Sequence, residues 1–76
     1  MPTILRIEGW RIVTHPNDHL PAQVHVKGPG WIAVITLHGP ELQEMIGGTL
    51  RDGRHALRVV TTHRNDLLAA WRRIHD

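Results

Sequence analysis

Residues 23–37, QVHVKGPGWIAVITL, contain the clearest structural signal in the chain. Gln23–Lys27 alternates polar and apolar residues, which predicts a strand with Val24 and Val26 facing a core. A Gly-Pro-Gly sequence then turns the chain. Trp31–Leu37 has apolar residues on both faces, which is typical of a central strand. The segment therefore predicts an antiparallel hairpin.

A second predicted hairpin precedes this segment. Thr3–Ile7 and Trp10–His15 are rich in β-forming residues, and Glu8-Gly9 between them is a turn signal. Residues 38–50 are ambiguous because Gly-Pro and Gly-Gly pairs interrupt them, although Leu42–Ile46 could form a short edge strand. The sequence therefore predicts four or five antiparallel strands.

From Asp52 onward the apolar residues follow a helical period, and Asp52 is the expected N-cap. One predicted helix face carries Ala56, Val60, Leu67, Trp71 and Ile74. Thr61–Asp66 contains poor helix formers, but the apolar stripe keeps its phase across them, which favours one helix over two. A one-faced sheet and a one-striped helix must bury each other. We therefore expect a single α+β domain over residues 1–76, in which a small antiparallel β-sheet packs against one long C-terminal α-helix in two layers.

The composition excludes several chemistries. The 76 residues include no Cys, Ser or Tyr, so disulfides, zinc–thiolate sites and Cys, Ser or Tyr nucleophiles are absent. The longest apolar runs have five residues, whereas a membrane span needs about 20. The first residues show no signal-peptide pattern. We therefore expect a cytoplasmic chain with no membrane partner.

The net charge of +2 is unevenly distributed, with −1 over residues 1–50 and +3 over residues 51–76. The candidates for contacts with nucleic-acid phosphates are Arg51, Arg54, Arg58, Arg72 and Arg73. The alternative interpretation is a solvated helix face. The small net charge predicts weak, non-specific nucleic-acid binding at most. The three Trp are expected in the core, which leaves no aromatic platform for bases.

The most polar segment runs from His15 to Lys27. Its candidate binding residues are Asn17, Asp18, His19, Gln23, His25 and Lys27. Two Pro bracket the loop that holds the first three, and strand alternation turns the last three away from the core. The functional interpretation is a shaped polar surface. The structural interpretation is turn chemistry, in which the loop side chains bond their own backbone.

Three chemistries can be compared for these histidines. His19, His25 and Asp18 could form a two-His, one-carboxylate metal face, but nothing in their spacing requires it, and we expect no metal and no cofactor. Gln23-Val24-His25 resembles the metal motif of rolling-circle nickases, which need a Tyr nucleophile that the chain lacks. A metal-independent ribonuclease or toxin remains as an alternative, with His19 and His25 as general acid and base beside Lys27.

Five stretches together resemble domain-of-unknown-function family 4160, a family of small bacterial proteins: MPTILRIEGWRIV, NDHLPAQVHV, GWIAVI, GGTL and HRNDLLAAWRRI. Gln23 stands where the family usually has the first His of a His-x-His pair. Members are often encoded beside another small domain, in an arrangement that looks like a toxin–antitoxin module. The resemblance therefore implies one half of a two-gene bacterial module.

Our first hypothesis is an interaction or regulatory domain rather than an enzyme. A short chain has a thin core, and an exposed sheet edge favours pairing with another chain. The partner would be a protein encoded by a neighbouring gene, or a second copy bound through a sheet edge. The candidate edges are Gln23–Lys27 and Leu42–Ile46.

Overall fold

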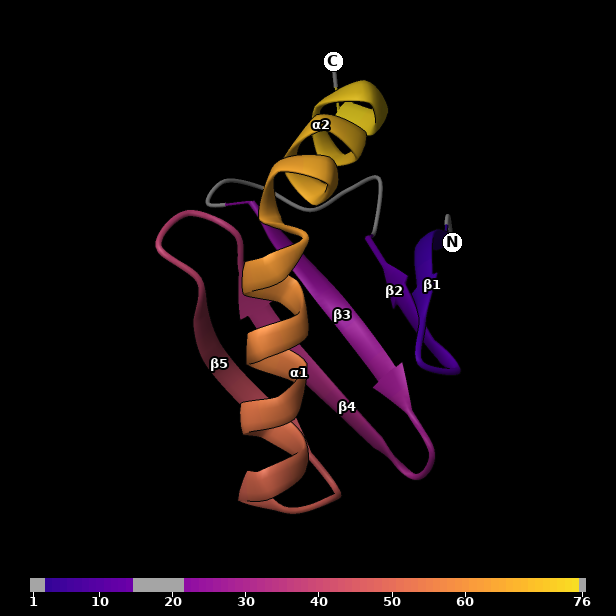
Figure 1. Ribbon diagram of the computed structural model, residues 1–76, viewed down its shortest axis with the longest axis vertical. Coiled ribbons are helices and arrows are strands. Elements are labelled where there is room, and N and C mark those ends of the chain that lie inside the picture. The colour runs from indigo at the N-terminus through magenta and orange to yellow at the C-terminus, as the bar shows by residue number, and fades with distance from the viewer. Residues whose placement is uncertain (1–2, 15–21, 76) are drawn as a thin grey trace.

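The computed structural model describes residues 3–14 and 22–75, which form a five-stranded antiparallel sheet with two helices on one face (Figure 1). The elements are β1 (Thr3–Ile7), β2 (Trp10–Val13), β3 (Gln23–Gly28), β4 (Trp31–Thr36), β5 (Glu41–Ile46), α1 (Leu50–Thr62) and α2 (Arg64–His75). The strands lie in the sheet in chain order, from β1 to β5. This arrangement confirms the predicted two-layer α+β fold.

The order of the strands corrects one prediction. Gln23–Lys27 is not an edge, because β3 lies in the middle of the sheet between β2 and β4. Its two valines, Val24 and Val26, are fully buried. Leu42–Ile46 does lie at an edge, within β5. The two edges of the described sheet are therefore β1 and β5.

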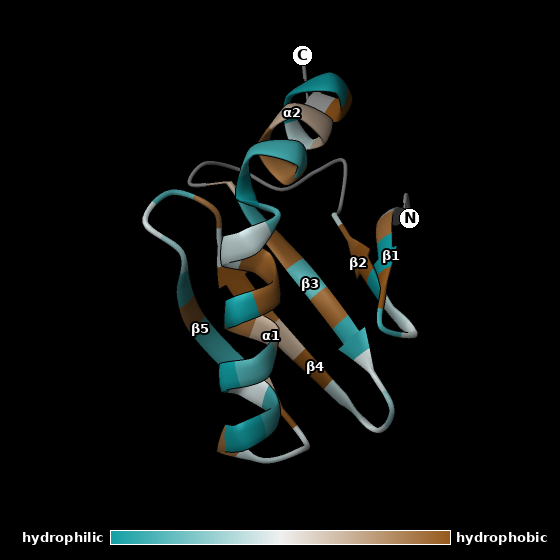
Figure 2. Cartoon of the chain, in the orientation of Figure 1, coloured by the Kyte–Doolittle hydropathy of each residue, from teal (hydrophilic) through white to brown (hydrophobic). Residues whose placement is uncertain are grey.

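The register of the strands gives the sheet one continuous apolar face. Val26 lies opposite Ile12 on β2 and opposite Ala33 on β4, and all three side chains are fully buried. Val24 lies opposite Ile35 in the same way. Figure 2 shows the resulting alternation of hydrophobic and hydrophilic residues along β3. The alternation predicted from sequence is therefore the pattern that the packing uses.

Both helices cover this apolar face. Ala56 and Val60 of α1 and Leu67 and Trp71 of α2 belong to the same hydrophobic cluster as the inward residues of the sheet. Their spacing is the stripe that the sequence predicted. Within the described residues, no helix is long and apolar enough to cross a membrane.

Helix α1 begins with a capping box. The N-cap is Thr49, whose Oγ1 accepts a hydrogen bond from the Asp52 N–H at 3.2 Å, while Asp52 Oδ2 accepts one from the Thr49 N–H at 2.9 Å. Asp52 is therefore the third helical residue and not the N-cap expected from sequence. The reciprocal bonds satisfy two of the N–H groups that a helix start leaves without partners.

The C-terminal helical region is two helices, α1 and α2, separated by His63, and not the one helix that the sequence favours. The hydroxyl groups of Thr61 and Thr62 donate to backbone carbonyls four residues earlier, at 2.7 Å and 3.0 Å. Such bonds bend helices. The Nε of Arg64 then donates to the carbonyl of Leu37 at 2.8 Å, which fixes the start of α2 against the end of β4. The bend directs α2 away from the axis of α1 (Figure 1).

The packing of Trp71 generates the first prediction. Trp71 is 8% exposed and belongs to the core cluster, so Trp71→Ala is expected to lower the free energy of unfolding by about 3–5 kcal/mol. A domain of this size has only about 4–11 kcal/mol in total. Urea denaturation measures the loss.

Leu50→Ala is the control for this experiment, because Leu50 is a large hydrophobic residue of α1 that is 69% exposed. Its removal is expected to change the free energy of unfolding by no more than about 0.5 kcal/mol. Equal effects of the two substitutions would contradict the packing of α2 on the sheet.

Candidate functional site

Neither of the two described helices covers the second face of the sheet, and a row of side chains crosses this face from edge to edge. The register places Arg6 of β1 opposite Arg11 of β2, Arg11 opposite Lys27 of β3, Lys27 opposite Ile32 of β4, and Ile32 opposite Ile46 of β5. Directly opposite residues of antiparallel strands point to the same face. We call Arg6, Arg11 and Lys27 the cationic row, and Ile32 and Ile46 the apolar pair that continues it.

The cationic row lies in an open depression between two turns. The depression has a volume of about 570 Å³. Besides the three cations, its lining consists of residues in or next to the two turns: Glu8, Gly9, Trp10, Gly28 and Pro29. Arg6 and Arg11 are exposed, and Lys27 is half-buried. Like charges directly opposite each other destabilise a sheet. The direct pairing of Arg6 with Arg11 is therefore unfavourable in the isolated chain, which makes the depression a candidate site for an anionic ligand.

Arg6 and Arg11 were not among the predicted site residues, because charge counted by position along the chain does not bring them together. The signal was nevertheless present. A two-residue Glu8-Gly9 turn pairs Ile7 with Trp10, so that residues 6 and 11 pair next. Since Ile7 and Trp10 face the core, both arginines face the opposite side.

Three of the residues predicted for a polar surface lie on β3. Gln23, His25 and Lys27 are half-buried and point to the helix-free face, as strand alternation predicts. The other three, Asn17, Asp18 and His19, lie outside the described residues. The predicted clustering of His19 with His25 therefore stays a prediction.

The residues directly opposite His25 on the neighbouring strands are apolar. Its directly opposite neighbours are Val13 on β2 and Val34 on β4, which are 1% and 7% exposed. His25 and Lys27 are both engaged in contacts with other groups. The second acid–base residue of the ribonuclease alternative, His19, lies outside the described residues, so this alternative stays a prediction.

The predicted arginine candidates lie on the helical layer. Arg51, Arg54 and Arg58 are exposed along α1, and Arg72 and Arg73 are exposed on α2. The cationic row lies on the other side of the sheet. The basic residues of the chain therefore do not form one continuous surface, which a high-affinity nucleic-acid interface would need.

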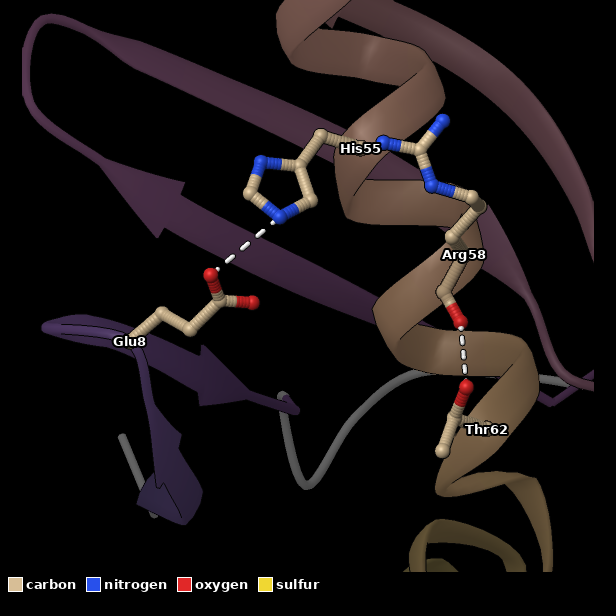
Figure 3. A network of polar contacts seen from close by, with 4 residues as sticks. All are labelled: Glu8, His55, Arg58 and Thr62. Atoms are coloured by element: carbon tan, nitrogen blue, oxygen red, sulfur yellow. Dashed lines mark hydrogen bonds and ion pairs between the residues drawn. The ribbon is translucent and has the colours of Figure 1, made fainter.

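A contact between Glu8 and His55 joins the β1–β2 turn to α1 (Figure 3). His55 Nε2 lies 3.2 Å from Glu8 Oε1. The His55 ring also packs edge-to-face on Trp10 at a centroid distance of 4.8 Å, and Trp10 packs in the same way on Trp31 at 5.1 Å. Because both partners of the Glu8–His55 contact are about half exposed, we interpret it as a structural contact that positions the turn.

The backbone of Glu8 is unusual. Its φ is 53° and that of Gly9 is 79°, so both turn residues are in the left-handed region of a two-residue type I′ hairpin. Asn-Gly is the preferred pair in such turns, and a residue with a long side chain is disfavoured in the first position. The backbone conformation of Glu8 is therefore unfavourable, whereas its carboxylate makes the contact with His55 of α1.

No group of three or more His, Cys, Asp or Glu side chains that could hold a metal ion occurs within residues 3–14 and 22–75. A second depression, with a volume of about 360 Å³, lies beside the Glu8–His55 contact, and its lining includes His63 and Arg58. The hydroxyl of Thr62 donates to the Arg58 carbonyl at 3.0 Å, within the helix (Figure 3).

Comparison with known proteins gives one match. The family model described as a domain of unknown function, DUF4160, matches residues 9–72. The match confirms the resemblance seen in the sequence, and it spans β2 to β5, α1 and most of α2. Arg11 and Lys27 lie inside the matched residues, and Arg6 lies outside them. No curated protein and no solved structure matches the chain.

The strain at Glu8 generates the second prediction. Glu8→Asn removes the disfavoured conformation at the loss of a half-exposed contact, so it is expected to raise the free energy of unfolding by about 0.5–1 kcal/mol. Glu8→Gln is the matched control. It keeps the backbone strain and removes the charge, and it is expected to lower the free energy of unfolding slightly. If Glu8→Asn destabilises the chain as much as Glu8→Gln, the contact with His55 outweighs the strain.

Proposed function

Since the chain belongs to the DUF4160 family of domains of unknown function, we propose from its own geometry that it is an interaction domain that binds a protein partner at the edge of its sheet. The proposal includes a regulatory role as one half of a bacterial two-gene, toxin–antitoxin-like module in the cytoplasm. Binding, and not turnover, would be its activity. The observation that carries the proposal is the open edge at β5.

Strand β5 forms one of the two edges of the described sheet. Within the described residues no element lies beyond it in the sheet order, and Figure 1 shows it at the margin of the molecule. At the other edge, Leu5 of β1 shares a depression with α2 residues such as Leu67 and Arg73. An edge strand offers unpaired backbone N–H and C=O groups to an incoming strand.

Exposed apolar side chains lie at the end of this edge. Ile46 is 50% exposed and Leu50 is 69% exposed, and they are the exposed large hydrophobic residues of the described chain. A strand added beside β5 would cover Ile46 and remove its apolar surface from water. The edge therefore combines backbone groups for affinity with an apolar contact.

Two features limit indiscriminate pairing at this edge. The register of β5 against β4 shifts between Val34 and Ile35, which leaves Gln43 as an extra residue. Glu41 and Glu44 are both exposed, and β5 carries no positive charge. A second copy would bring the same acidic strand to the edge, so charge favours a different partner with basic or neutral side chains.

The edge generates the third prediction. We expect the product of the adjacent gene to bind the purified chain, and Ile46→Lys to weaken this binding about tenfold, because a charged side chain is a typical guard of sheet edges. Isothermal titration calorimetry measures the affinity. Leu50→Lys is the control. It makes the same chemical change in the first turn of α1, outside the strand, and is expected to weaken binding less than about twofold.

Three outcomes bear on the proposal. Equal losses of affinity in Ile46→Lys and Leu50→Lys would show that the partner binds a general apolar patch and does not add a strand to the sheet. No binding by the adjacent gene product, with a chain that stays monomeric in sedimentation at about 100 μM, would contradict the interaction role. A stable dimer that Ile46→Lys disrupts would replace the protein partner by a second copy.

The separation of the basic residues generates the fourth prediction. In about 150 mM salt, the chain is expected to bind single- or double-stranded nucleic acid no more tightly than about 10⁻⁶ M, because its net charge is +2 and its arginines lie on two sides of the sheet. Fluorescence anisotropy with labelled oligonucleotides measures the affinity. Sub-micromolar, sequence-dependent binding would contradict this expectation.

A further inference from the structure

The cationic row is the charged feature of the sheet that the proposed strand addition at β5 does not use. Arg6 and Arg11 face each other directly, and Lys27 follows on the next strand. We propose that these three side chains bind an acidic peptide segment of the protein partner. This inference rests on the proposed interaction role and gives the chemistry of the partner.

The lack of an acidic partner for Arg6 and Arg11 among the described residues points to an external anion. Among residues 3–14 and 22–75, neither Arg6 nor Arg11 forms an ion pair with a carboxylate. Glu8 is the acidic residue that lines the same depression, but its Oε1 lies 3.2 Å from His55 Nε2 on the helical side. The one described acid of the depression is therefore engaged with α1. Two exposed guanidinium groups remain, each able to hold a carboxylate through two parallel hydrogen bonds.

The neighbours of the row favour a peptide over a nucleic acid. The row continues into Ile32 and Ile46, which match an apolar side chain next to the acidic ones. Trp10, Trp31 and Trp71 are each at least nine-tenths buried, so no described aromatic ring is available to stack on a base. The arginines that could follow a phosphate backbone lie on the opposite layer.

The dimensions of the sheet are compatible with an extended peptide. Neighbouring strands lie about 4.8 Å apart, so the row from β1 to β3 spans about 10 Å. Side chains two residues apart in an extended peptide point to the same side at a spacing of about 7 Å. Two acidic residues at positions i and i+2 would therefore reach the row, and an apolar residue at i+4 or beyond would reach Ile32.

The test is an NMR titration of the full chain with decaglutamate. We expect amide shifts of β1, β2 and β3 at the cationic row, and about fivefold weaker binding for the double variant Arg6→Gln/Arg11→Gln. The matched control is Arg54→Gln/Arg58→Gln, which removes the same two charges from α1 and is expected to weaken binding less than about twofold. The first double variant is also expected to keep or raise the melting temperature, because it removes a like-charge pair.

Two results would overturn the inference. Equal weakening in the two double variants would show that net charge alone attracts the peptide. Tighter binding of an eleven-residue oligothymidylate, which carries the same ten negative charges, would assign the row to nucleic acid.

The edge variant separates this inference from the proposed function. Ile46→Lys leaves the cationic row in place, so it is expected to bind decaglutamate at least as well as the unmodified chain. Suppose that Arg6→Gln/Arg11→Gln keeps full affinity for the adjacent gene product while Ile46→Lys loses it. The inference about the cationic row is then wrong, and the proposed binding at the β5 edge is supported. If decaglutamate binds at the cationic row but no protein partner binds the chain, the anion-binding site is supported and the proposed interaction role is contradicted.

Discussion

The burial of one sheet face by both helices is the constraint on which the rest of the structure depends. The register of β3 against β4 and β2 brings Val24, Val26, Ala33 and Ile35 to that face, and each is fully buried. A chain of 76 residues has only enough apolar surface for one such core. Within the described residues, neither helix covers the cationic row on the other face or extends the sheet beyond the β5 edge.

The β1–β2 hairpin is positioned by contacts from the covered side. Trp10 packs between Trp31 and His55, and Glu8 extends from the turn to His55. These contacts hold the turn against α1 and thereby fix Arg6 and Arg11 on the opposite face. A strained residue at such a position indicates that the geometry of the turn matters beyond simple chain reversal.

Much of the fold could be predicted from alternation and helical period, because both report directly which side chains a core must bury. Val24 and Val26 on a strand, and Val60 and Trp71 on a helical stripe, are in the core as predicted. The order of the strands in the sheet was harder to predict. Alternation shows which face of Gln23–Lys27 is buried but not how many neighbours the strand has, and the pairing of β2 with β3 joins segments separated by the longest connection in the sheet.

Local hydrogen bonds set the details that periodicity could not supply. The bend at His63 depends on the hydroxyls of Thr61 and Thr62, and the start of α1 depends on Thr49, whose pairing with Asp52 has the spacing of a capping box. The residues of the predicted loop site, Asn17, Asp18 and His19, lie outside the described residues. The cationic row could have been derived from the two-residue turn, because register, and not distance along the chain, determines which charges meet.

Because the core of the chain is small, partner binding would also affect its stability. A partner that binds only the folded chain stabilises it by about 2.7 kcal/mol when its concentration is one hundred times the dissociation constant. For a domain of this size, that is a substantial fraction of the total free energy of unfolding. In the proposed complex the partner would cover Ile46 at the edge and neutralise the like charges of Arg6 and Arg11, which are both unfavourable in the isolated chain. Binding and stability would then be coupled through the surfaces that the helices leave open, so the amount of folded chain would follow the amount of its partner.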